Sequence, residues 1–289
     1  MPSPSSRSLL KRGVSSLVGG NMTSGWLEVA REAAKLPALL SDIYGDLLKP
    51  GVRQVGKALE TVIGLGNTAL WPIALANERA RISLERNFEK YREQMNDVPE
   101  EKVSPIPPEI GVPVAEKLAY VSDEELSQLY VNLLAKASTV DTAHFAHPSF
   151  VNVINNLCPD EAIILKALHR TTSVPFITAN LYQKDKKNQF TTIGDLLTGL
   201  ETRQKLAFPR NTVAYMSNFE GLGLIQIRRD VHLADAAIYT SLENLYRPSF
   251  LGLEGQDNLE IKFKKGKIEV TPFGSLFINA CLTKLAKRG

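Results

Sequence analysis

Residues 120–168 read YVSDEELSQLYVNLLAKASTVDTAHFAHPSFVNVINNLCPDEAIILKAL, and this stretch decides the predicted fold. The serine and last glutamate of SDEE (122–125) form a capping box, in which both side chains satisfy amides of the first helical turn. Pro148 and Pro159 can each open a further helix, because proline is tolerated at the first helical position. Apolar residues follow each start at helical spacing. We therefore predict a central helical core over residues 114–170.

Towards the N-terminus, residues 26–98 are predicted to form a helical region. Its most apolar part, residues 52–76, is interrupted by glycine, asparagine and proline, whereas a membrane-spanning helix needs about 20 continuous apolar residues. We therefore predict a buried helical hairpin and no transmembrane helix. The alternative is an interfacial or conditionally inserting segment, in which Leu70 and Trp71 would contact the membrane.

A more charged helix ends this region, with apolar residues on one side only. Leu84, Phe88, Tyr91 and Met95 are spaced four, three and four residues apart. Such a narrow stripe suits packing against another helix, either in the same chain or in a second subunit. Phe88 and Tyr91 are therefore candidate interaction-surface residues.

Two non-helical segments are predicted beside these helices. Residues 1–25 contain basic residues and serines but no acid. Their short apolar run is cut by Lys11 and Arg12, which favours a disordered tail over a signal peptide. Residues 99–113 contain five prolines. Because proline lacks a donor and restricts the residue before it, we predict an extended connector there.

The remaining residues, 171–289, are predicted to form a separate module. Residues 174–181 fit a short strand or an irregular connector, and residues 193–200 fit a short helix. Residues 209–219 are expected to form a helix, which Gly221 ends by taking the left-handed conformation. A short strand is expected directly after it.

The end of the module shows a hairpin pattern followed by a helix. Apolar residues alternate over 259–263 and 268–270, and Lys264-Lys265-Gly266-Lys267 separates the two runs like a turn. Helix, helix, strand, ribbon and helix is the order of a winged-helix module, an analogy that implies architecture only. The predicted fold class is mainly α, with a helical N-terminal and central region followed by an α+β winged-helix-like C-terminal module.

Composition indicates an ordinary globular protein with a mild basic excess. The net charge is +3 and the pI is about 8.7, far less positive than a dedicated nucleic-acid binder usually is. Cys158 and Cys281 are far apart and lack metal-ligand spacing. A reducing compartment fits them better than a disulfide framework, so we expect a cytoplasmic protein.

Residues with catalytic or metal-binding spacing are scarce. His144 and His147 lie three apart near Asp141, but no nearby cysteine or further histidine completes a metal site. The chain has no GxSxG, HExxH, paired CxxC or lysine-bearing phosphate loop. The acids of 123–125 and 160–161 are explained by helix starts. We therefore expect no enzyme, and no catalytic, cofactor-binding or metal-binding residue or cofactor.

Basic residues of the last module are the best indication of nucleic-acid binding. In a winged helix, the wing and the helix after Pro209 can both reach phosphates. The candidate contacts are Arg210, Lys264, Lys265 and Lys267. The alternative is that a hairpin tip carries lysines for solvation and to discourage aggregation.

Four motifs of the central stretch are more specific than any of these patterns. They are DEEL (123–126), LYVNLLA (129–135), HPSFV (147–151) and LCPDEA (157–162). Together they resemble the Abi-alpha family of bacterial abortive-infection proteins, formerly a domain of unknown function, and the likeness extends over about residues 30–285. Tyr130-Val131 replaces a phenylalanine-alanine pair, and Cys158 replaces a serine cap. The resemblance implies a bacterial cytosolic protein linked to phage defence and brings no established catalytic residues.

The sequence thus favours a non-enzymatic phage-defence (antiviral) protein of the abortive-infection kind, acting through protein partners or self-association. One alternative is a winged-helix DNA-binding regulator. A further alternative is a membrane-perturbing effector that uses the apolar residues 52–76.

Overall fold

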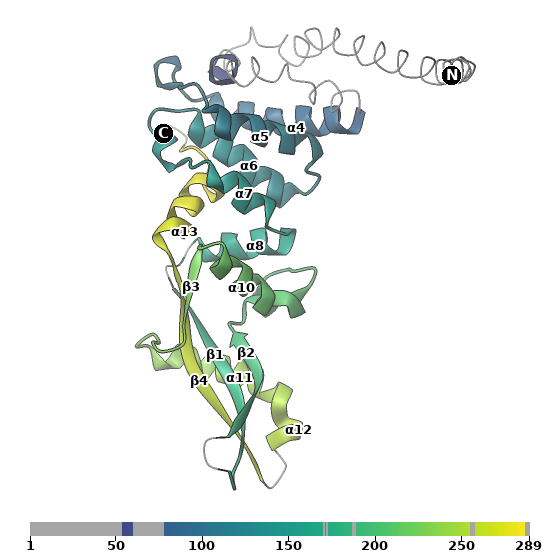
Figure 1. The fold of residues 1–289 in the computed structure, drawn as a ribbon, viewed down its shortest axis with the longest axis vertical. Coiled ribbons are helices and arrows are strands. Elements are labelled where there is room, and N and C mark those ends of the chain that lie inside the picture. Colours follow the sequence, from purple (N-terminus) through teal and green to yellow (C-terminus); the bar gives the residue numbers. More distant parts are fainter. Residues whose placement is uncertain are drawn as a thin grey trace, which may run out of the picture. The chain divides into compact units, whose positions relative to one another are not determined.

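The computed structural model describes residues 54–59, 78–169, 171, 173–186, 189–254 and 258–286. The chain divides into two compact units, one ending at Tyr120 and the other beginning at Val121. Figure 1 labels the helices and strands of both units. The predicted tail (1–25), the first half of the predicted N-terminal region and most of the apolar segment 52–76 lie outside the described residues.

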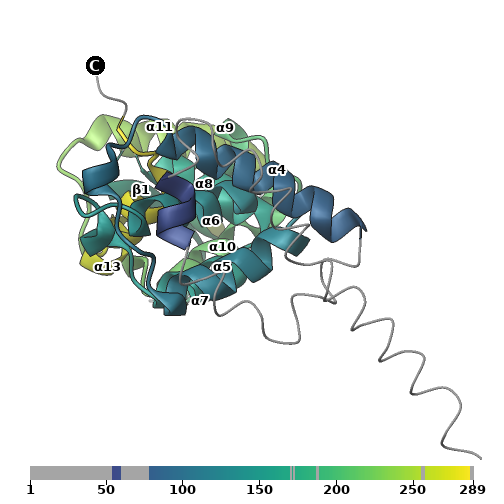
Figure 2. The same ribbon diagram turned by 90° about the horizontal axis from the view of Figure 1, so that it is seen from above.

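The first unit contains two packed helices, α4 (Glu78–Met95) and α5 (Pro108–Tyr120) (Figure 2). Its buried side chains on α4 include the whole stripe that the spacing picked out: Leu84, Phe88, Tyr91 and Met95. The Asn87 amide donates a hydrogen bond of 2.9 Å to the carbonyl of Leu118, so a buried polar contact also joins the two helices. A helical turn at 54–59 contacts the segment before α5, because the amide of Ile106 donates to the carbonyl of Ala58 at 3.0 Å.

Residues 108–113 are helical, not extended as the proline content predicted. Pro108 occupies the first position of α5, where no backbone donor is needed. Only Pro113 lies inside the helix. A 3₁₀ turn (Glu100–Lys102) and the non-helical residues 104–107 precede it. The error arose because the position of a proline within a helix, rather than its presence, decides whether it breaks the helix.

The second unit begins with the predicted central helices, which are confirmed as α6 (Glu124–Ala137), α7 (Ser149–Asn155) and α8 (Pro159–Leu168). A 3₁₀ turn (Ala143–Phe145) lies between the first two. The cap of α6 is Asp123 and not the predicted serine: its carboxylate accepts from the amide of Leu126 at 3.0 Å. The N-cap of α7 is Pro148, and Nδ1 of the preceding His147 accepts from the amide of Ser149 at 3.2 Å.

The predicted final helix is α13 (Pro272–Phe277), which continues as a π-helix (Ile278–Leu282). The ring of Phe277 meets that of Phe150 on α7 edge to face, with centroids 5.3 Å apart. From α6, Asn132 donates to the carbonyl of Cys281 at 2.7 Å, and Lys136 Nζ donates to the carbonyl of Lys284 at 3.2 Å. These contacts hold residues 272–284 against α6 and α7. Because Lys136 is buried there, its pKa is lowered.

Four antiparallel strands form one sheet in the order β2-β1-β4-β3 (Figure 1). They are β1 (Ser173–Gln183), β2 (Phe190–Leu197), β3 (Ile225–Arg228) and β4 (Leu259–Val270). Two predictions fail here. Residues 259–270 are one continuous strand rather than a hairpin, because β1 pairs along nearly all of it. Residues 193–200 lie mostly in β2, and the short helix α9 (Leu200–Arg203) begins only at their end.

Gly266 explains the mistaken hairpin. It lies within β4, where a Cβ would come within 2.3 Å of the Phe176 ring and 2.8 Å of the carbonyl oxygen of Arg228. A strand uses glycine where another group must approach the backbone this closely. In the sequence, the same glycine among lysines resembles a turn.

Helices pack on the sheet, and one of them was not anticipated. This helix, α11 (Ala236–Tyr246), packs on β1, where Ile177, Tyr239, Leu242 and Tyr246 form a buried cluster. A 3₁₀ turn (Arg247–Phe250) and the short α12 (Leu251–Glu254) follow it.

The helix predicted over 209–219 is confirmed as a 3₁₀ turn (Pro209–Asn211) running into α10 (Thr212–Gly221), which contacts β2 and β3. The left-handed residue after α10 is Gly223, with φ of 75°, and not Gly221. The predicted strand after this helix is β3.

The described chain is therefore mainly helical, with one four-stranded antiparallel sheet in its C-terminal part. Because β4 is a single strand, the two-stranded ribbon of the predicted winged-helix order does not form. Within the described ranges, no helix combines the length and the apolarity that crossing a membrane requires.

Candidate functional site

A buried carboxylate at the start of α8 organises the second unit. Asp160 is only 3% exposed. One of its oxygens accepts from the amide of Ala207 at 2.8 Å, and the other accepts from the amide of Phe208 at 2.7 Å and from the Tyr215 hydroxyl at 3.0 Å. One side chain thus fixes both the segment before α10 and α10 itself.

The electrostatics agree with an anchor that is ionised at neutral pH. Burial would raise the pKa of Asp160, but the hydrogen bonds from Ala207, Phe208 and Tyr215 outweigh it and hold this pKa below its usual value. Burial, together with the hydrogen bond to Asp160, raises the pKa of Tyr215 to about 12. The phenol therefore stays protonated as the donor at neutral pH.

The neighbouring Glu161 makes a second link to the same helix. One oxygen accepts from the amide of Cys158 at 2.7 Å, which is the helix-start role expected from the sequence. The other oxygen accepts from the side-chain amide of Asn218 on α10 at 2.8 Å. Burial raises the pKa of the Cys158 thiol, which disfavours the reactive thiolate. Asp160 and Glu161 together therefore link the start of α8 to α10.

The segment that Asp160 holds displays an apolar side chain to solvent. We name residues 206–213 the anchored loop. Its Phe208 is 65% exposed and Val213, in the first turn of α10, is 41% exposed. Arg210, a predicted nucleic-acid contact, is exposed between them. A rigid backbone therefore presents one aromatic, one aliphatic and one cationic side chain on the same short stretch.

Strand alternation separates the three predicted contact lysines. Lys265 and Lys267 are half-buried on the face that carries α11: Lys265 Nζ lies 5.4 Å from the Tyr239 ring centroid, and Lys267 pairs with Glu269 at 2.6 Å. Lys264 lies on the opposite face. The three lysines thus do not form the predicted wing, because 264–267 is not a hairpin tip.

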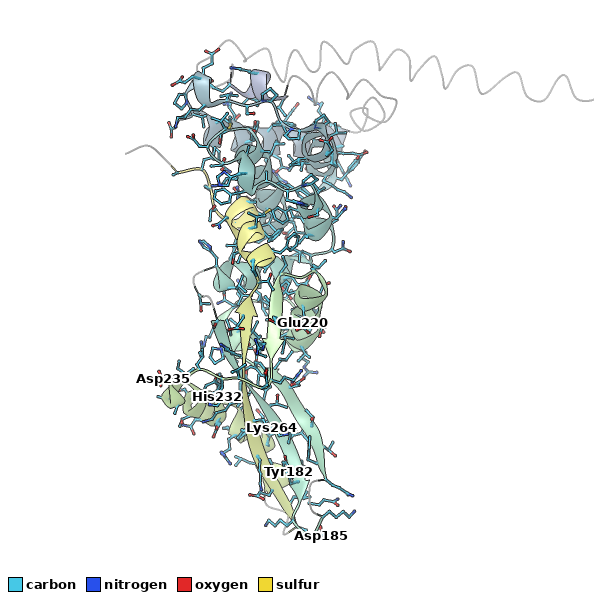
Figure 3. All side chains as sticks on the ribbon, turned by 60° about the vertical axis from the view of Figure 1, so that its left-hand side comes forward. Tyr182, Asp185, Glu220, His232, Asp235 and Lys264 are labelled. Carbon is cyan, nitrogen blue, oxygen red and sulfur yellow. The ribbon has the colours of Figure 1, made fainter. Side chains whose placement is uncertain are left out.

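The face that carries Lys264 holds a group which sequence reasoning missed. Tyr182 and Phe190 are directly paired across β1 and β2, with ring centroids 5.2 Å apart. Lys262 Nζ lies 5.2 Å from the Tyr182 centroid, and Lys264 Nζ lies 4.7 Å from the Phe190 centroid. Figure 3 labels Tyr182 and Lys264 on this part of the sheet. The predicted short helix over 193–200 concealed the pairing.

Of the other predicted contact residues, the structure describes Phe88 and Tyr91, and neither is exposed. Phe88 and Tyr91 are buried in the first unit, because their stripe packs against α5. Leu70 and Trp71 lie outside the described residues. His147 accepts from the first amide of α7, and the His144 ring centroid lies 4.0 Å from that of Phe145. Within the described part of the chain, no group of three or more histidine, cysteine or acidic side chains could hold a metal ion.

Comparison with known protein families matches residues 83–281 to the family described as abortive infection alpha. The chain belongs to the abortive infection alpha family. Comparisons with curated proteins and with solved structures find no match. The family resemblance seen in the four motifs is thereby confirmed.

The abortive infection alpha match contains the anchor, the anchored loop and the whole sheet. Its motifs have structural roles in this chain: LYVNLLA forms α6, HPSFV opens α7 and CPDEA opens α8. Membership of the abortive infection alpha family suggests defence of the abortive-infection type.

Proposed function

We propose that this chain is a non-enzymatic, cytoplasmic protein of bacterial phage defence, and that it acts by binding a protein partner through the anchored loop. The single observation that carries the proposal is the exposed ring of Phe208 on a backbone fixed by a buried carboxylate. Family membership supports the defence role.

The geometry suits protein recognition for two reasons. Aromatic anchors dominate the energetics of interfaces, and Phe208 is the most exposed of the large apolar side chains in the described residues. Binding also costs less when the contacting segment is already ordered. The two hydrogen bonds from Ala207 and Phe208 to Asp160 supply that order before a partner arrives.

The first prediction concerns Phe208→Ser. We expect it to reduce protection in a phage-plating assay at least tenfold, because an interface anchor of this kind contributes about 1.4 kcal/mol or more. Its thermal unfolding should match the wild type, since the ring is exposed. Leu251→Ser is the matched control: Leu251 is 60% exposed on α12, away from the anchored loop, and should keep full protection. Unchanged protection by Phe208→Ser would contradict the proposal.

A DNA-binding regulator is the second candidate, and the exposed Arg210 in the 3₁₀ turn before α10 favours it. This candidate no longer includes a wing, because β4 is continuous. The membrane-perturbing alternative depends on residues 52–76, most of which lie outside the described residues, and it stays a prediction.

The second prediction tests this candidate with a labelled DNA duplex. Duplex affinity should fall steeply with salt, and Arg210→Ala should reduce the slope of log K against log salt by about 0.9, the value of one phosphate contact. Lys267→Ala is the control, because Lys267 is paired with Glu269 and lies on the sheet. A flat salt titration would exclude duplex binding through this helix.

A further inference from the structure

The outer part of the sheet has one open face. On β1 and β4, alternate residues point to opposite faces, and α11 contacts the face of Ile177. On the other face, Phe190 is 46% exposed, and Lys262 and Lys264 are exposed as well. We name Tyr182, Phe190, Lys262 and Lys264 the aromatic-lysine patch.

The patch combines two aromatic rings on paired strands with two lysine ammonium groups over them. Tyr182 lies opposite Phe190 on β2 and opposite Glu260 on β4. Each ring carries one ammonium group over its face, at 5.2 Å for Lys262 and 4.7 Å for Lys264. Next to the rings on the same face, the Thr192 hydroxyl donates to the Asn180 side chain at 2.9 Å, which keeps β2 and β1 aligned.

The charges around the patch favour a negatively charged occupant. Glu260 pairs with Lys262 at 3.0 Å, and Asp195 is held by Arg229 at 2.7 Å and by Thr178. Among the residues that the structure describes, no carboxylate pairs with Lys264; its ammonium rests on a ring. Lys186, in the turn after β1, is exposed at the same end of the sheet. Figure 3 shows its neighbour Asp185 at this tip.

We propose that the aromatic-lysine patch binds single-stranded nucleic acid, with two neighbouring bases stacking on Tyr182 and Phe190. Lys262 and Lys264 leave the ring faces and contact the phosphates on either side. Proteins that bind single strands combine these two elements, aromatic stacking platforms and a basic track for the backbone. A single strand fits because its bases are free to stack on side chains, whereas those of a duplex are stacked on each other.

This activity is independent of the protein contact proposed for the anchored loop. Its stacking residues, Tyr182 and Phe190, were not part of the winged-helix alternative. The proposal also explains an exposed phenylalanine on an edge strand, which is otherwise an aggregation hazard. A protein partner for the same face is less favoured, because charged residues are depleted in the cores of protein interfaces.

The test is fluorescence anisotropy of the full chain with labelled oligothymidylate and oligouridylate of about 12 nucleotides, a length within the range of single-strand sites. We expect binding of at least one strand that weakens with salt. Phe190→Ala and Tyr182→Ala should each weaken it about 5- to 100-fold, because stacking of one base is lost. Phe190→Trp should restore binding, which separates stacking from damage to the fold.

Neighbouring lysines on the same strand supply the charge control. Lys264→Gln should weaken binding and reduce the salt slope by about 0.7, the single-strand value for one phosphate. Lys265→Gln removes the same charge from the adjacent residue on the opposite face and should leave affinity unchanged. Three results would each overturn the proposal: no binding by the wild type, equal effects of the two lysine variants, or tighter binding of a duplex of the same length.

Discussion

Asp160→Ala is expected to lower the free energy of unfolding by about 4 kcal/mol, because hydrogen bonds to a charged group contribute roughly 1.5–3 kcal/mol each without being additive. The carboxylate accepts from two backbone amides and a buried tyrosine hydroxyl. Alanine would remove the acceptor of all three donors, of which the Tyr215 hydroxyl is buried. Urea unfolding followed by circular dichroism measures the loss.

Asp123→Ala is the matched control for this variant. Asp123 also begins a helix, but its carboxylate caps it through one hydrogen bond, to the amide of Leu126. Removal of such a cap costs about 1 kcal/mol. Equal losses for the two variants would show that Asp160 is no more than a helix cap, as its place in the sequence first indicated.

The same carboxylate should contribute to acid sensitivity. Its folded-state pKa lies below the value of about 3.9 for an unfolded aspartate. The stability it supplies is therefore complete well above that pH and is lost as pH falls towards the folded-state pKa. Asp160→Asn should consequently show a flatter decline of stability below roughly pH 5 than the wild type. An identical decline would contradict the lowered pKa.

Gly274→Ala is expected to destabilise the second unit by about 3 kcal/mol, the upper end for overpacking a close contact. A Cβ at this position would lie 1.9 Å from the carbonyl oxygen of Leu224 and 2.8 Å from its carbon. Both atoms belong to the backbone and cannot rotate away. The Thr271 hydroxyl donates to the carbonyl of Gly223 at 2.6 Å. This bond holds the start of α13 beside Leu224, so the helix cannot easily move away.

Gly221→Ala provides the contrast within the same unit. Gly221 ends α10, and a Cβ there would meet nothing within 4 Å. We expect this change to be neutral or to stabilise by up to about 1 kcal/mol, because alanine is the better helix former. Thermal unfolding of both variants checks the pair. Similar stability of the two would refute the close approach of α13 to Leu224.

The helices of the central stretch could be predicted from the sequence because their signals are local. Caps, prolines at first positions and apolar spacing all act within a few residues, and α6, α7, α8 and α10 are confirmed. The failures share a cause. Gly266 marks close approach by Phe176, a contact between residues 90 positions apart that no local pattern reveals.

The candidate sites were less predictable than the fold for the same reason. The acids of CPDEA do begin a helix as expected, yet their other bonds reach Phe208, Tyr215 and Asn218, about 50 residues later. Lys264 was singled out for its charge. The approach of its ammonium group to the Phe190 ring depends on the pairing of β1 with β4 and of β1 with β2. The helix predicted over 193–200 excluded the second pairing.

The bonds from Asn132 and Lys136 to the carbonyls of Cys281 and Lys284 have a consequence for biosynthesis. Both side chains are buried in the finished unit, and these two carbonyl acceptors are translated nearly 150 residues after the side chains that bond to them. Strand β1 likewise waits for β4. Pairings of such long sequence separation form slowly. The second unit therefore completes its fold only after residues 281–284 have been translated, and incompletely folded chains of this size are prone to aggregate.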